Sequence, residues 1–581
     1  MKTIVRLLKL VWPYKKWIAL SVFLGLLTVG SGIGLMMTSA FIISAAALHP
    51  SIAELQVAIV GVRFFGISRG VFRYLERLVS HDTTFRLLSR FRVWFYQKLE
   101  PLVPARTLYM KSADLLQRII GDIQNLENFY VRVVAPPAVA VCVALLMLPL
   151  LGMFHLKYAT IFLIFFAIAG TVIPAFSLQL SRGLGKRIVQ LQSELNIAIV
   201  DNVKGLRELQ VFNGTDKQQS KIDELNARIN NLQKRMHIID ALNQGFITLL
   251  MFGAVIMVLM AAIPAVSHGH LKGVYLAVIV LGIMAAFEAV LPLPTAFQFM
   301  ESNISAAQRL FGIIDSKPMV ENIPGASDLT GETFAIELSD VVLRYPQSEA
   351  PALNRLNLNI PAGARVAIVG PSGSGKSSIA NILLRLWEFQ EGAITLNHKD
   401  IRSFTQESIR EAIGFVSQRF HLFTGTIAEN LRLVQPELSD EELLRMLDIV
   451  ALQASDLGKT DRGEILSYWI GEHGTLLSGG QAQRLAIAQV LCKNPRVLLF
   501  DEITANLDPA TERIVMDRLF ETYRQRTIIN ITHRLNIMER YDQIFVLQNG
   551  KVVQQGRHEA LLKQEGLYRH IYLVQTEQAM M

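Results

Sequence analysis

The chain has 581 residues, of which 51% are hydrophobic and 18% are charged, and its formal net charge is +8. Soluble globular proteins carry about 25% charged residues, so this composition is typical of a membrane protein. Two cysteines, Cys142 and Cys492, are too few for a disulfide framework and lie in no metal-ligand spacing. We therefore exclude a secreted enzyme, a small disulfide scaffold and a disordered tail. The positive charge favours basic cytoplasmic loops over nucleic-acid binding.

Apolar residues are concentrated before about residue 300 and predict six membrane-spanning helices. Each apolar stretch has about the 20 residues that a helix needs to cross a hydrocarbon core of ~30 Å. No cleavable signal is expected, because Trp17 leads directly into a full-length span. The approximate ranges are 17–45, 55–79, 133–154, 157–180, 242–266 and 274–298.

Basic residues set the expected orientation of these spans in the lipid bilayer. Lysines and arginines precede the first span and follow the second and the fourth, whereas the alternate loops are very short. The positive-inside rule then places both termini and the long loops, at about 80–132 and 181–241, in the cytoplasm. These loops have helix-like patterning, so we expect helices that project well below the bilayer.

A change of composition divides the chain into two domains. Residues 316–333 are polar and rich in turn-forming residues, which predicts a linker. A six-helix transmembrane domain at 1–315 would precede it. An α/β domain would follow at 334–581, where short apolar runs such as 366–369 and 497–500 are typical of buried parallel strands.

A glycine-rich motif after the first of these strands fits the P-loop pattern, and an apolar helical run follows it. This strand–loop–helix context is the one that a P-loop requires. Its glycines let backbone N–H groups face phosphates, Lys376 can reach the β- and γ-phosphates, and the Ser377 hydroxyl can ligate Mg²⁺. The predicted phosphate-binding residues are Gly370, Pro371, Ser372, Gly373, Ser374, Gly375, Lys376, Ser377 and Ser378.

A pair of carboxylates follows the second apolar strand. Asp501 ends the strand, as a Walker B carboxylate does when it reaches Mg²⁺, and Glu502 could polarise an attacking water. Alone, such a pair is more often an ordinary strand end. The P-loop upstream favours the functional interpretation.

A third motif identifies the family by resemblance. Leu477, Ser478, Gly479, Gly480 and Gln481 lie between the other two motifs and resemble the signature of the ATP-binding cassette family. The resemblance implies that ATP and Mg²⁺ bind here and that hydrolysis drives transport. It also implies that the signature residues Ser478, Gly479, Gly480 and Gln481 contact nucleotide.

The remaining family motifs are carried over by position. Gln418 matches the Q-loop and is a further Mg²⁺ ligand, and Asp508 lies in the D-loop. Tyr345 matches the aromatic residue that stacks on adenine, although by itself it could be a surface aromatic. His533 matches the switch histidine, and its alternative is a hydrogen-bonded core histidine. The resemblance thus implies hydrolysis by Lys376, Gln418, Glu502 and His533. Ile503 replaces the usual proline but removes no catalytic atom.

The motif count implies a dimer. There is one P-loop and one signature, whereas in this family each ATP lies between the P-loop of one cassette and the signature of another. Six spans and one cassette therefore resemble half of an exporter. Turns near 112–117 and 203–211 are candidates for the coupling helices that such exporters have.

A narrower resemblance involves the run after the second span. Residues 73–86, together with Val131–Val133 and Ala285–Ala289, resemble the CydC subunits of the CydDC family, which is required for cytochrome bd assembly. That family implies a heterodimer with a CydD-like half in a bacterial inner membrane. It also implies export of glutathione and cysteine to the periplasm, with haem as a proposed ligand or cargo.

Candidate cargo residues lie near the cytoplasmic end of the second span. Arg73, Arg77 and His81 are spaced i, i+4, i+8 and share one helical face. They could clamp carboxylates of glutathione or haem, and His81 could ligate haem iron. Alternatively, the arginines pair with nearby acids or lipid headgroups. Glu288 in the sixth span should face the interior, either toward cargo or as an ion-pair partner of an arginine.

Two other functions stay open for the same fold. One is a homodimeric exporter of lipids or drugs, which would be active when this chain is expressed alone. The other is a haem-responsive regulatory ATPase subunit that gates assembly without moving a cargo.

Overall fold

The computed structural model describes residues 2–49, 51–105, 115, 118–346 and 348–580. The chain forms two compact units, Met1–Lys317 and Pro318–Met581. The predicted turn at 112–117 lies outside the described residues, apart from Leu115. The turn predicted at 203–211 contains a short helix, α10.

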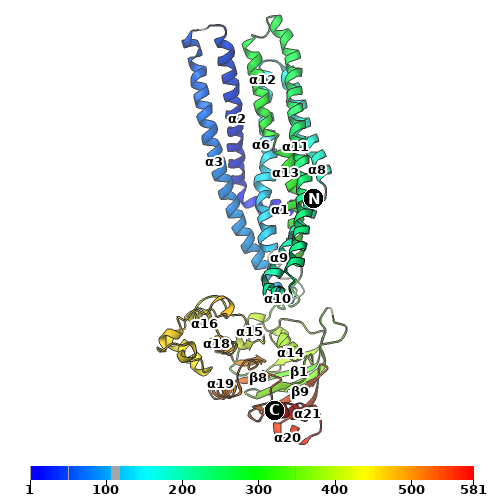
Figure 1. Cartoon of the computed structure of the whole chain (residues 1–581), viewed down its shortest axis with the longest axis vertical. Helices are drawn as coiled ribbons and strands as arrows, with labels where there is room; N and C mark the ends of the chain where they lie inside the picture. Colours follow the sequence, from blue (N-terminus) through cyan, green and yellow to red (C-terminus); the bar gives the residue numbers. More distant parts are fainter. Residues whose placement is uncertain (1, 50, 106–114, 116–117, 347, 581) are drawn as a thin grey trace. The chain divides into compact units, whose positions relative to one another are not determined.

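The described part of the first unit is helical (Figure 1). In chain order its helices are α1 (Lys2–Val11), η1 (Trp12–Tyr14), α2 (Lys15–Ala46), α3 (Ile52–Leu99), η2 (Glu100–Leu102), η3 (Arg118–Asp122), α5 (Ile123–Asn128), η4 (Phe129–Val134), α6 (Ala135–Gly152), α7 (Leu156–Ala167), η5 (Ile168–Val172), α8 (Ile173–Ser181), α9 (Leu184–Lys204), α10 (Leu206–Val211), α11 (Thr215–Ser267), α12 (Val274–Ala286), η6 (Phe287–Ala289) and α13 (Leu293–Ile314).

Six helical stretches of the described residues are long and apolar enough to cross a membrane, as the sequence predicts. α3 has 48 residues and α11 has 53. At about 1.5 Å per residue each exceeds twice the thickness of a hydrocarbon core, so both must extend beyond a bilayer. The six stretches are Trp12–Ala46, Ile52–Leu102, Arg118–Gly152, Leu156–Ser181, Thr215–Ser267 and Val274–Ile314.

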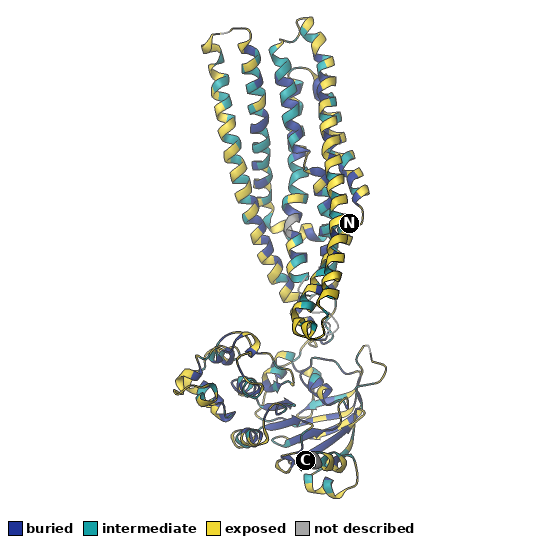
Figure 2. Ribbon diagram, in the orientation of Figure 1, coloured by how far each residue is buried: buried dark blue, intermediate teal, exposed yellow. Residues whose placement is uncertain are grey.

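Burial is uneven among these helices. A tightly packed apolar core joins α6, α7, α11 and α12, with Val143, Phe162, Ala254 and Ile283 fully buried in it. α3 packs along α2, but its most apolar window contains no buried residue. Figure 2 shows exposed residues along most of its length. One side of α3 is therefore left uncovered by the described residues of this chain.

The sixth span differs from the continuous helix expected at 274–298. It breaks between α12 and α13, and the single turn η6 (Phe287–Ala289) carries Glu288. Pro292 begins the next segment, and a proline inside a helix has no N–H to donate to the preceding turn. Phe287 anchors the break by packing its ring edge-on against Phe162 and Phe166.

The second unit contains two sheets. An antiparallel sheet has the order β2-β1-β4-β5, and a mostly parallel one has the order β10-β9-β3-β8-β7-β6. In the parallel sheet β3, β8 and β7 are buried along nearly their whole length, as their apolar sequences predict (Figure 2). The strands are β1 (Ile336–Leu343), β2 (Leu353–Ile360), β3 (Arg365–Val369), β4 (Glu391–Leu396), β5 (Lys399–Asp400), β6 (Ile413–Val416), β7 (Val497–Asp501), β8 (Thr527–Ile531), β9 (Gln543–Gln548) and β10 (Lys551–Gly556).

Helices and short helical turns pack on these sheets. They are α14 (Lys376–Leu383), η7 (Ile401–Ser403), α15 (Gln406–Ala412), α16 (Ile427–Arg432), α17 (Asp440–Ile449), η8 (Ala454–Leu457), η9 (Gly463–Ile465), η10 (Glu472–Gly474), α18 (Gly479–Leu491), α19 (Pro509–Thr522), η11 (Met538–Arg540), α20 (His558–Lys563) and α21 (Leu567–Met580).

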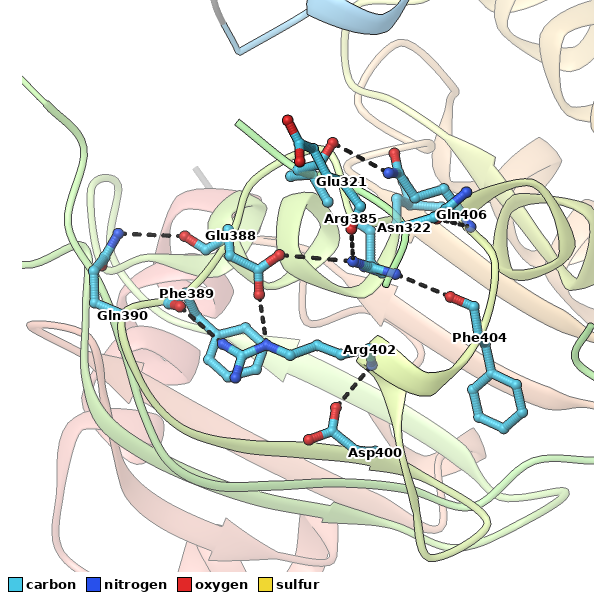
Figure 3. A network of polar contacts seen from close by, with 12 residues as sticks. Glu321, Asn322, Arg385, Glu388, Phe389, Gln390, Asp400, Arg402, Phe404 and Gln406 are labelled. Atoms are coloured by element: carbon cyan, nitrogen blue, oxygen red, sulfur yellow. Dashed lines mark hydrogen bonds and ion pairs between the residues drawn. The ribbon is translucent and has the colours of Figure 1, made fainter. Parts of the chain in front are cut away.

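Part of the predicted linker is hydrogen-bonded to the second unit. The buried Arg385, which follows α14, donates to the carbonyl oxygens of Glu321 at 2.9 Å and Phe404 at 2.9 Å (Figure 3). The Asn322 side chain accepts from the Gln406 N–H at 2.9 Å. These contacts fix residues 321–322 against the end of the P-loop helix.

Candidate functional site

The parallel sheet explains why motifs that are far apart in sequence meet. Neighbouring strands β3, β8, β7 and β6 are parallel, so their carboxyl ends lie at one edge. The loops after them carry, in that order, the P-loop, His533, the Asp501–Glu502 pair and Gln418. The edge beyond the carboxyl ends is where open α/β sheets bind ligands.

Glycine is required at two positions of the P-loop. Gly370 has φ 155° and Gly375 has φ 100°, and residues with a side chain rarely adopt such a backbone conformation. A Cβ at Gly370 would lie 2.2 Å from the Leu547 carbonyl oxygen, and one at Gly375 would lie 2.4 Å from that of Ala352. The loop is therefore packed directly on backbone, which fixes its N–H groups in place.

Lys376, the first residue of α14, is buried beneath this loop. Its Nζ donates to the carbonyl oxygens of Gly370 at 2.8 Å and Pro371 at 3.0 Å. Burial lowers the pKa of Lys376, while the nearby carboxylates Glu502 and Asp501 oppose that shift. The ammonium group is thus held inside the curl of the loop, where phosphate oxygens would be its natural partners.

Glu502 is the centre of a hydrogen-bonded group that contains two other predicted catalytic residues. Gln418 donates its amide Nε2 to Glu502 Oε2 at 2.5 Å, and Nδ1 of His533 lies 3.3 Å from Glu502 Oε1. Glu502 itself has φ 53°, an uncommon conformation for a residue with a side chain. Its N–H donates to the Ile531 carbonyl at 2.8 Å, which holds this turn against β8.

The predicted metal ligands are also adjacent. Asp501 ends β7 and is 5% exposed, and its carboxylate is hydrogen-bonded to the Ser377 side chain. Burial raises the pKa of Asp501, whereas the bond from Ser377 lowers it. A hydroxyl, a carboxylate and the Gln418 amide oxygen are the hard oxygen donors that Mg²⁺ prefers, so these residues fit the ion.

A cavity of about 760 Å³ opens at this edge of the sheet. Its size is typical of small-molecule sites. It is also lined by residues of the C-terminal helix α21, which the sequence motifs do not indicate: Leu567, His570, Ile571 and Gln575. The predicted site residues that line it are Gly370, Pro371, Ser372, Gly373, Gly375, Lys376, Ser377, Ser378, Gln418, Glu502 and His533.

The signature and the D-loop do not line this cavity. Ser478 caps α18 through its bond from the Gln481 N–H at 3.3 Å, with Gly479 and Gly480 in the first turn. Asp508 caps α19 by accepting from the N–H groups of Ala510 and Thr511. These predicted nucleotide contacts are thus presented away from the chain's own P-loop.

Tyr345 also lies outside the residues that line the cavity. Its hydroxyl donates to the Ser378 side chain at 3.1 Å and accepts from Asn381 at 3.0 Å, and its ring packs edge-on against Trp387 at 4.7 Å. The predicted stacking on adenine stays a prediction. In this conformation the tyrosine braces the P-loop helix.

Two further residues connect the motifs and were not singled out from the sequence. Gln483, 1% exposed on α18, donates to the Glu502 carbonyl at 3.3 Å and accepts from the Asn506 N–H at 3.1 Å. Arg534 donates to the carbonyl oxygens of Ala505 at 2.7 Å and Leu507 at 2.8 Å. Neither residue belongs to a motif of its own. The one signal in the sequence was proximity, since Gln483 follows the signature and Arg534 follows the switch histidine.

Of the predicted cargo residues, Arg73, Arg77 and His81 lie on α3 and Glu288 lies on η6, and the structure pairs Arg73 with Glu288. Arg73 lies 3.4 Å from Glu288, while Arg69, one turn earlier, donates to both Glu288 oxygens at 2.8 and 2.9 Å. Glu288 is therefore an ion-pair partner of two arginines, which is one of the two roles expected for it.

Arg77 and His81 are exposed on the same face of α3. In the part of the chain that the structure describes, neither side chain forms a hydrogen bond or an ion pair, and the His81 ring lies 6.3 Å from that of Phe85. Asp82, one of the expected partners of the arginines, binds Arg86 at 2.8 Å. The structure thus brings Arg73 to Glu288, whereas Arg77 and His81 have only the electrostatic attraction of the Glu76 carboxylate.

A smaller cavity of about 350 Å³ adjoins the Arg69–Glu288 pair. Three methionines, Met36, Met251 and Met284, contribute to its lining. The lining of this cavity therefore combines a charged pair with polarisable side chains.

Comparisons with known proteins agree with this architecture. Residues 16–289 match the model of the ABC transporter transmembrane region, and residues 353–505 match that of the ABC transporter. The glutathione/L-cysteine transport system ATP-binding/permease protein CydC of Escherichia coli K12 is 33% identical over 98% of this chain and 99% of its own length. The ATP-dependent lipid A-core flippase of Salmonella paratyphi A is 33% identical over 68% of both chains.

A solved structure shows the same fold. It is that of a bacterial Atm1-family ABC exporter with ATP bound, which is 24% identical, with a TM-score of 0.86 over 97% of this chain and 98% of the other. The ATPase domain uses ATP and Mg²⁺, and its hydrolysis is coupled to transport across a membrane that the chain crosses several times. The chain belongs to the ABC transporter family, as an exporter-type protein similar to CydC, with an ATP-binding cassette and, among the residues that the structure describes, six helices long and apolar enough to cross a membrane.

Proposed function

We propose that this chain is one half of a heterodimeric exporter that moves reduced thiols, glutathione and cysteine, from the cytoplasm to the periplasm. The second half would be a CydD-like homologue, in a bacterial inner membrane, and the complex would support cytochrome bd assembly. The observation that carries the proposal is the match with CydC over nearly the whole of both chains. The charge of the loops supports a cytoplasmic location for both termini and the cassette.

The geometry of the cassette supports specific roles for its residues. The P-loop N–H groups and Lys376 would hold the phosphates, and Ser377, Asp501 and Gln418 would hold Mg²⁺, which supplies charge neutralisation on the phosphates. Glu502 would orient and polarise the attacking water, and His533 would contact the γ-phosphate. Tyr345 would stack on adenine, and the signature residues and Asp508 would serve the partner's nucleotide.

The separation of the signature from the P-loop supports a two-chain site. Ser478, Gly479, Gly480 and Gln481 do not line the cavity that holds Lys376 and Glu502. A nucleotide in this cavity therefore has no signature contact from its own cassette. A second cassette would supply that contact and receive this chain's signature in return.

The open face of α3 supports an anionic cargo. Arg77 and His81 are exposed, and among the described residues neither side chain forms a hydrogen bond or an ion pair, although Glu76 attracts both. Arg73 lies on the same helix and contacts Glu288. Guanidinium groups form charge-assisted hydrogen bonds with carboxylates, which glutathione and haem propionates both carry. His81 would ligate iron if haem binds here.

A haemin titration tests the cargo face. The complex is purified in detergent after co-expression with its partner, and Soret absorption is followed for wild type, His81→Ala and His237→Ala, the last an exposed histidine on α11. We expect a saturable Soret shift that His81→Ala abolishes and His237→Ala retains. Absence of a shift, or a shift indifferent to His81→Ala, would return His81 to a structural role and leave reduced thiols as the cargo.

Transport is tested separately in inverted membrane vesicles. We expect ATP-dependent uptake of radiolabelled glutathione only when both halves are present. The similarity to the lipid A-core flippase favours a second candidate, a homodimeric exporter of lipids or drugs. Lipid transport by this chain expressed alone would favour that candidate. A third candidate is a haem-responsive regulatory ATPase, which haemin would stimulate without vectorial movement of thiol or haem.

A further inference from the structure

The C-terminal helix α21 forms one wall of the nucleotide cavity. Four of its side chains, Leu567, His570, Ile571 and Gln575, line the cavity, and their spacing places them on one helical face. The last family motif carried over by position is the switch histidine, His533, so none of these motifs reaches this helix. The helix therefore contributes contacts that the motif-based site does not contain.

The helix is firmly anchored at its start. Tyr568 is fully buried, its hydroxyl lies 2.7 Å from Nδ1 of His558, and its N–H donates to the Gln554 side chain at 3.0 Å. The His558 ring also packs edge-on against the rings of Tyr568 and Tyr572. α21 is thus held in a defined position on the cassette, and this fixes the position of its following turns.

Gln575 uses both atoms of its amide on the loop that carries the switch histidine. Its Nε2 donates to the His533 carbonyl, and its Oε1 accepts from the Leu535 N–H at 3.1 Å. The two bonds hold the backbone on both sides of Arg534. An amide is required for this pairing, because it must donate and accept at once.

Arg534 holds the same loop from the other side. Its guanidinium binds the carbonyl oxygens of Ala505 and Leu507, beyond Glu502 in the chain. The His533 backbone is therefore fixed between α21 and the D-loop. Its imidazole is left 51% exposed in the cavity, 3.3 Å from the Glu502 carboxylate.

We propose that Gln575 is a positioning residue for ATP hydrolysis, which acts through the His533–Leu535 loop to keep the imidazole on Glu502 and the γ-phosphate. The proposal rests on the proposed roles of His533 and Glu502. The Gln575 amide is already committed to two backbone groups, so its effect falls on the geometry of His533. Loss of the amide would let the loop move, and a displacement of about 1 Å at a catalytic group can cost ~100-fold in rate.

The test measures steady-state ATP hydrolysis by the full-length chain, co-expressed with its partner and reconstituted in lipid. For Gln575→Ala we expect kcat to fall by roughly 10- to 100-fold, with the KM for MgATP within about twofold of wild type. Gln575→Glu keeps the acceptor for the Leu535 N–H but loses the donor to the His533 carbonyl, so its kcat should fall as well. Val574→Ala, an exposed neighbour on α21 that does not line the cavity, is the matched control and should keep the wild-type kcat.

Measuring the effect of Gln575→Ala in a His533→Ala variant distinguishes a positioning role of Gln575 from a general loss of structure. In a His533→Ala background, Gln575→Ala should lower kcat no further, because its effect passes through the histidine. An unchanged or raised kcat for Gln575→Ala overturns the proposal. A rise in KM without a fall in kcat also overturns it, because Gln575 would then be a nucleotide contact. A full additional fall in kcat in the His533→Ala background overturns it as well.

The roles of His533 and Gln575 can be tested apart from each other. If His533→Ala keeps the wild-type kcat, the proposed role of the switch histidine is wrong, and the role of Gln575 is wrong with it. If His533→Ala lowers kcat strongly but Gln575→Ala does not lower it, the catalytic site stands and only the role of Gln575 is lost.

Discussion

The two candidate sites of this chain are built in opposite ways. In the cassette, polar side chains arrive from four neighbouring strand ends and bind one another, as Gln418, Glu502 and His533 do. On α3, polar side chains come from one helix, and Arg69 and Arg73 share a single acid from another element, Glu288. Apart from the signature residues, one chain supplies all the predicted catalytic residues of the first site. The second has one wall and needs another surface to enclose a ligand.

The difference follows from what each site must do. Hydrolysis requires groups held to within fractions of an ångström, and a sheet edge with short loops provides that. A cargo site that alternates between two sides of a membrane must open, so a single exposed helical face suits it. We therefore expect substitutions in the cassette to act on rates, and substitutions on α3 to act on affinity.

The largest expected effect is that of Glu502→Gln. The amide keeps the size of the side chain but cannot act as a base, so kcat for ATP hydrolysis should fall by roughly 10²- to 10⁴-fold. MgATP binding should persist, because Lys376 and the P-loop are untouched. Steady-state ATPase assays and equilibrium nucleotide binding measure the two quantities. The exposed carboxylate Glu437, outside the cavity, provides the matched control Glu437→Gln, and an equal fall in kcat for both would contradict the assignment.

The next effect separates two arginines on the same face of α3. Among the described residues the Arg77 side chain forms no hydrogen bond or ion pair and has only the electrostatic attraction of the neighbouring Glu76, whereas Arg73 is already 3.4 Å from Glu288. Arg77→Gln should therefore weaken haemin binding by roughly 10- to 100-fold, the value of one or two charge-assisted hydrogen bonds. Arg73→Gln should weaken it less, by about threefold, because that guanidinium is partly neutralised.

Haemin affinity from Soret titrations checks this ranking. Arg90, an exposed arginine on a different face of α3, gives the control Arg90→Gln. If all three variants lose affinity equally, the positive charge of the helix matters and the face does not. That result would remove the distinction between the two arginines.

A third effect concerns stability in the membrane unit. Glu288→Gln leaves Arg69, whose side chain is 28% exposed, without its carboxylate. Removing one partner of a buried pair costs several kcal/mol, but Glu288 is 36% exposed, so we expect a loss of about 1–2 kcal/mol. Thermal unfolding of the purified complex should show a lower midpoint, and the double variant Arg69→Gln/Glu288→Gln should recover part of it. A double variant less stable than Glu288→Gln would show that Arg69 is not the destabilised group.

Much of the cassette could be predicted from sequence because its function depends on backbone. Gly370 and Gly375 are required by close contacts with carbonyl oxygens, and such positions leave a recognisable motif. The six spans are predictable because a bilayer demands length and apolarity. The break at η6 was missed because the apolar residues continue through it, although Pro292 and Pro294 were available as signals.

Contacts between single residues were the part that sequence could not supply. Gln575 and Arg534 bind carbonyl and N–H groups of loops outside their own helix or turn, and no spacing in the sequence indicates which backbone groups those are. The partnership of Arg69 with Glu288 likewise depends on how α3 lies beside the broken sixth span. The negative charge of Glu288 inside an apolar span indicated that it needs a partner, but the sequence did not indicate which arginine this partner is.

The smallest expected effect uses the two cysteines, one in each unit. Cys492 is 6% exposed at the end of α18, and burial raises its pKa to about 12. In the unfolded chain the thiol has its ordinary pKa of about 8.5. Between these values the folded cassette keeps the proton and the unfolded chain releases it, so stability must fall as the pH rises above about 8.5.

At pH 9.5 the thiol should cost the folded cassette about 1 kcal/mol relative to pH 7.5. Cys492→Ala removes that loss, whereas Cys142→Ala, in the membrane helix α6, should leave it unchanged. The pKa of the buried Tyr523 is raised to about 12 as well, but its ordinary value is near 10, so the window from pH 8.5 to 9.5 reports mainly on the thiol. Thermal midpoints of the three proteins at the two pH values measure the difference. An identical loss in Cys492→Ala and wild type would show that other groups set the alkaline stability of the cassette.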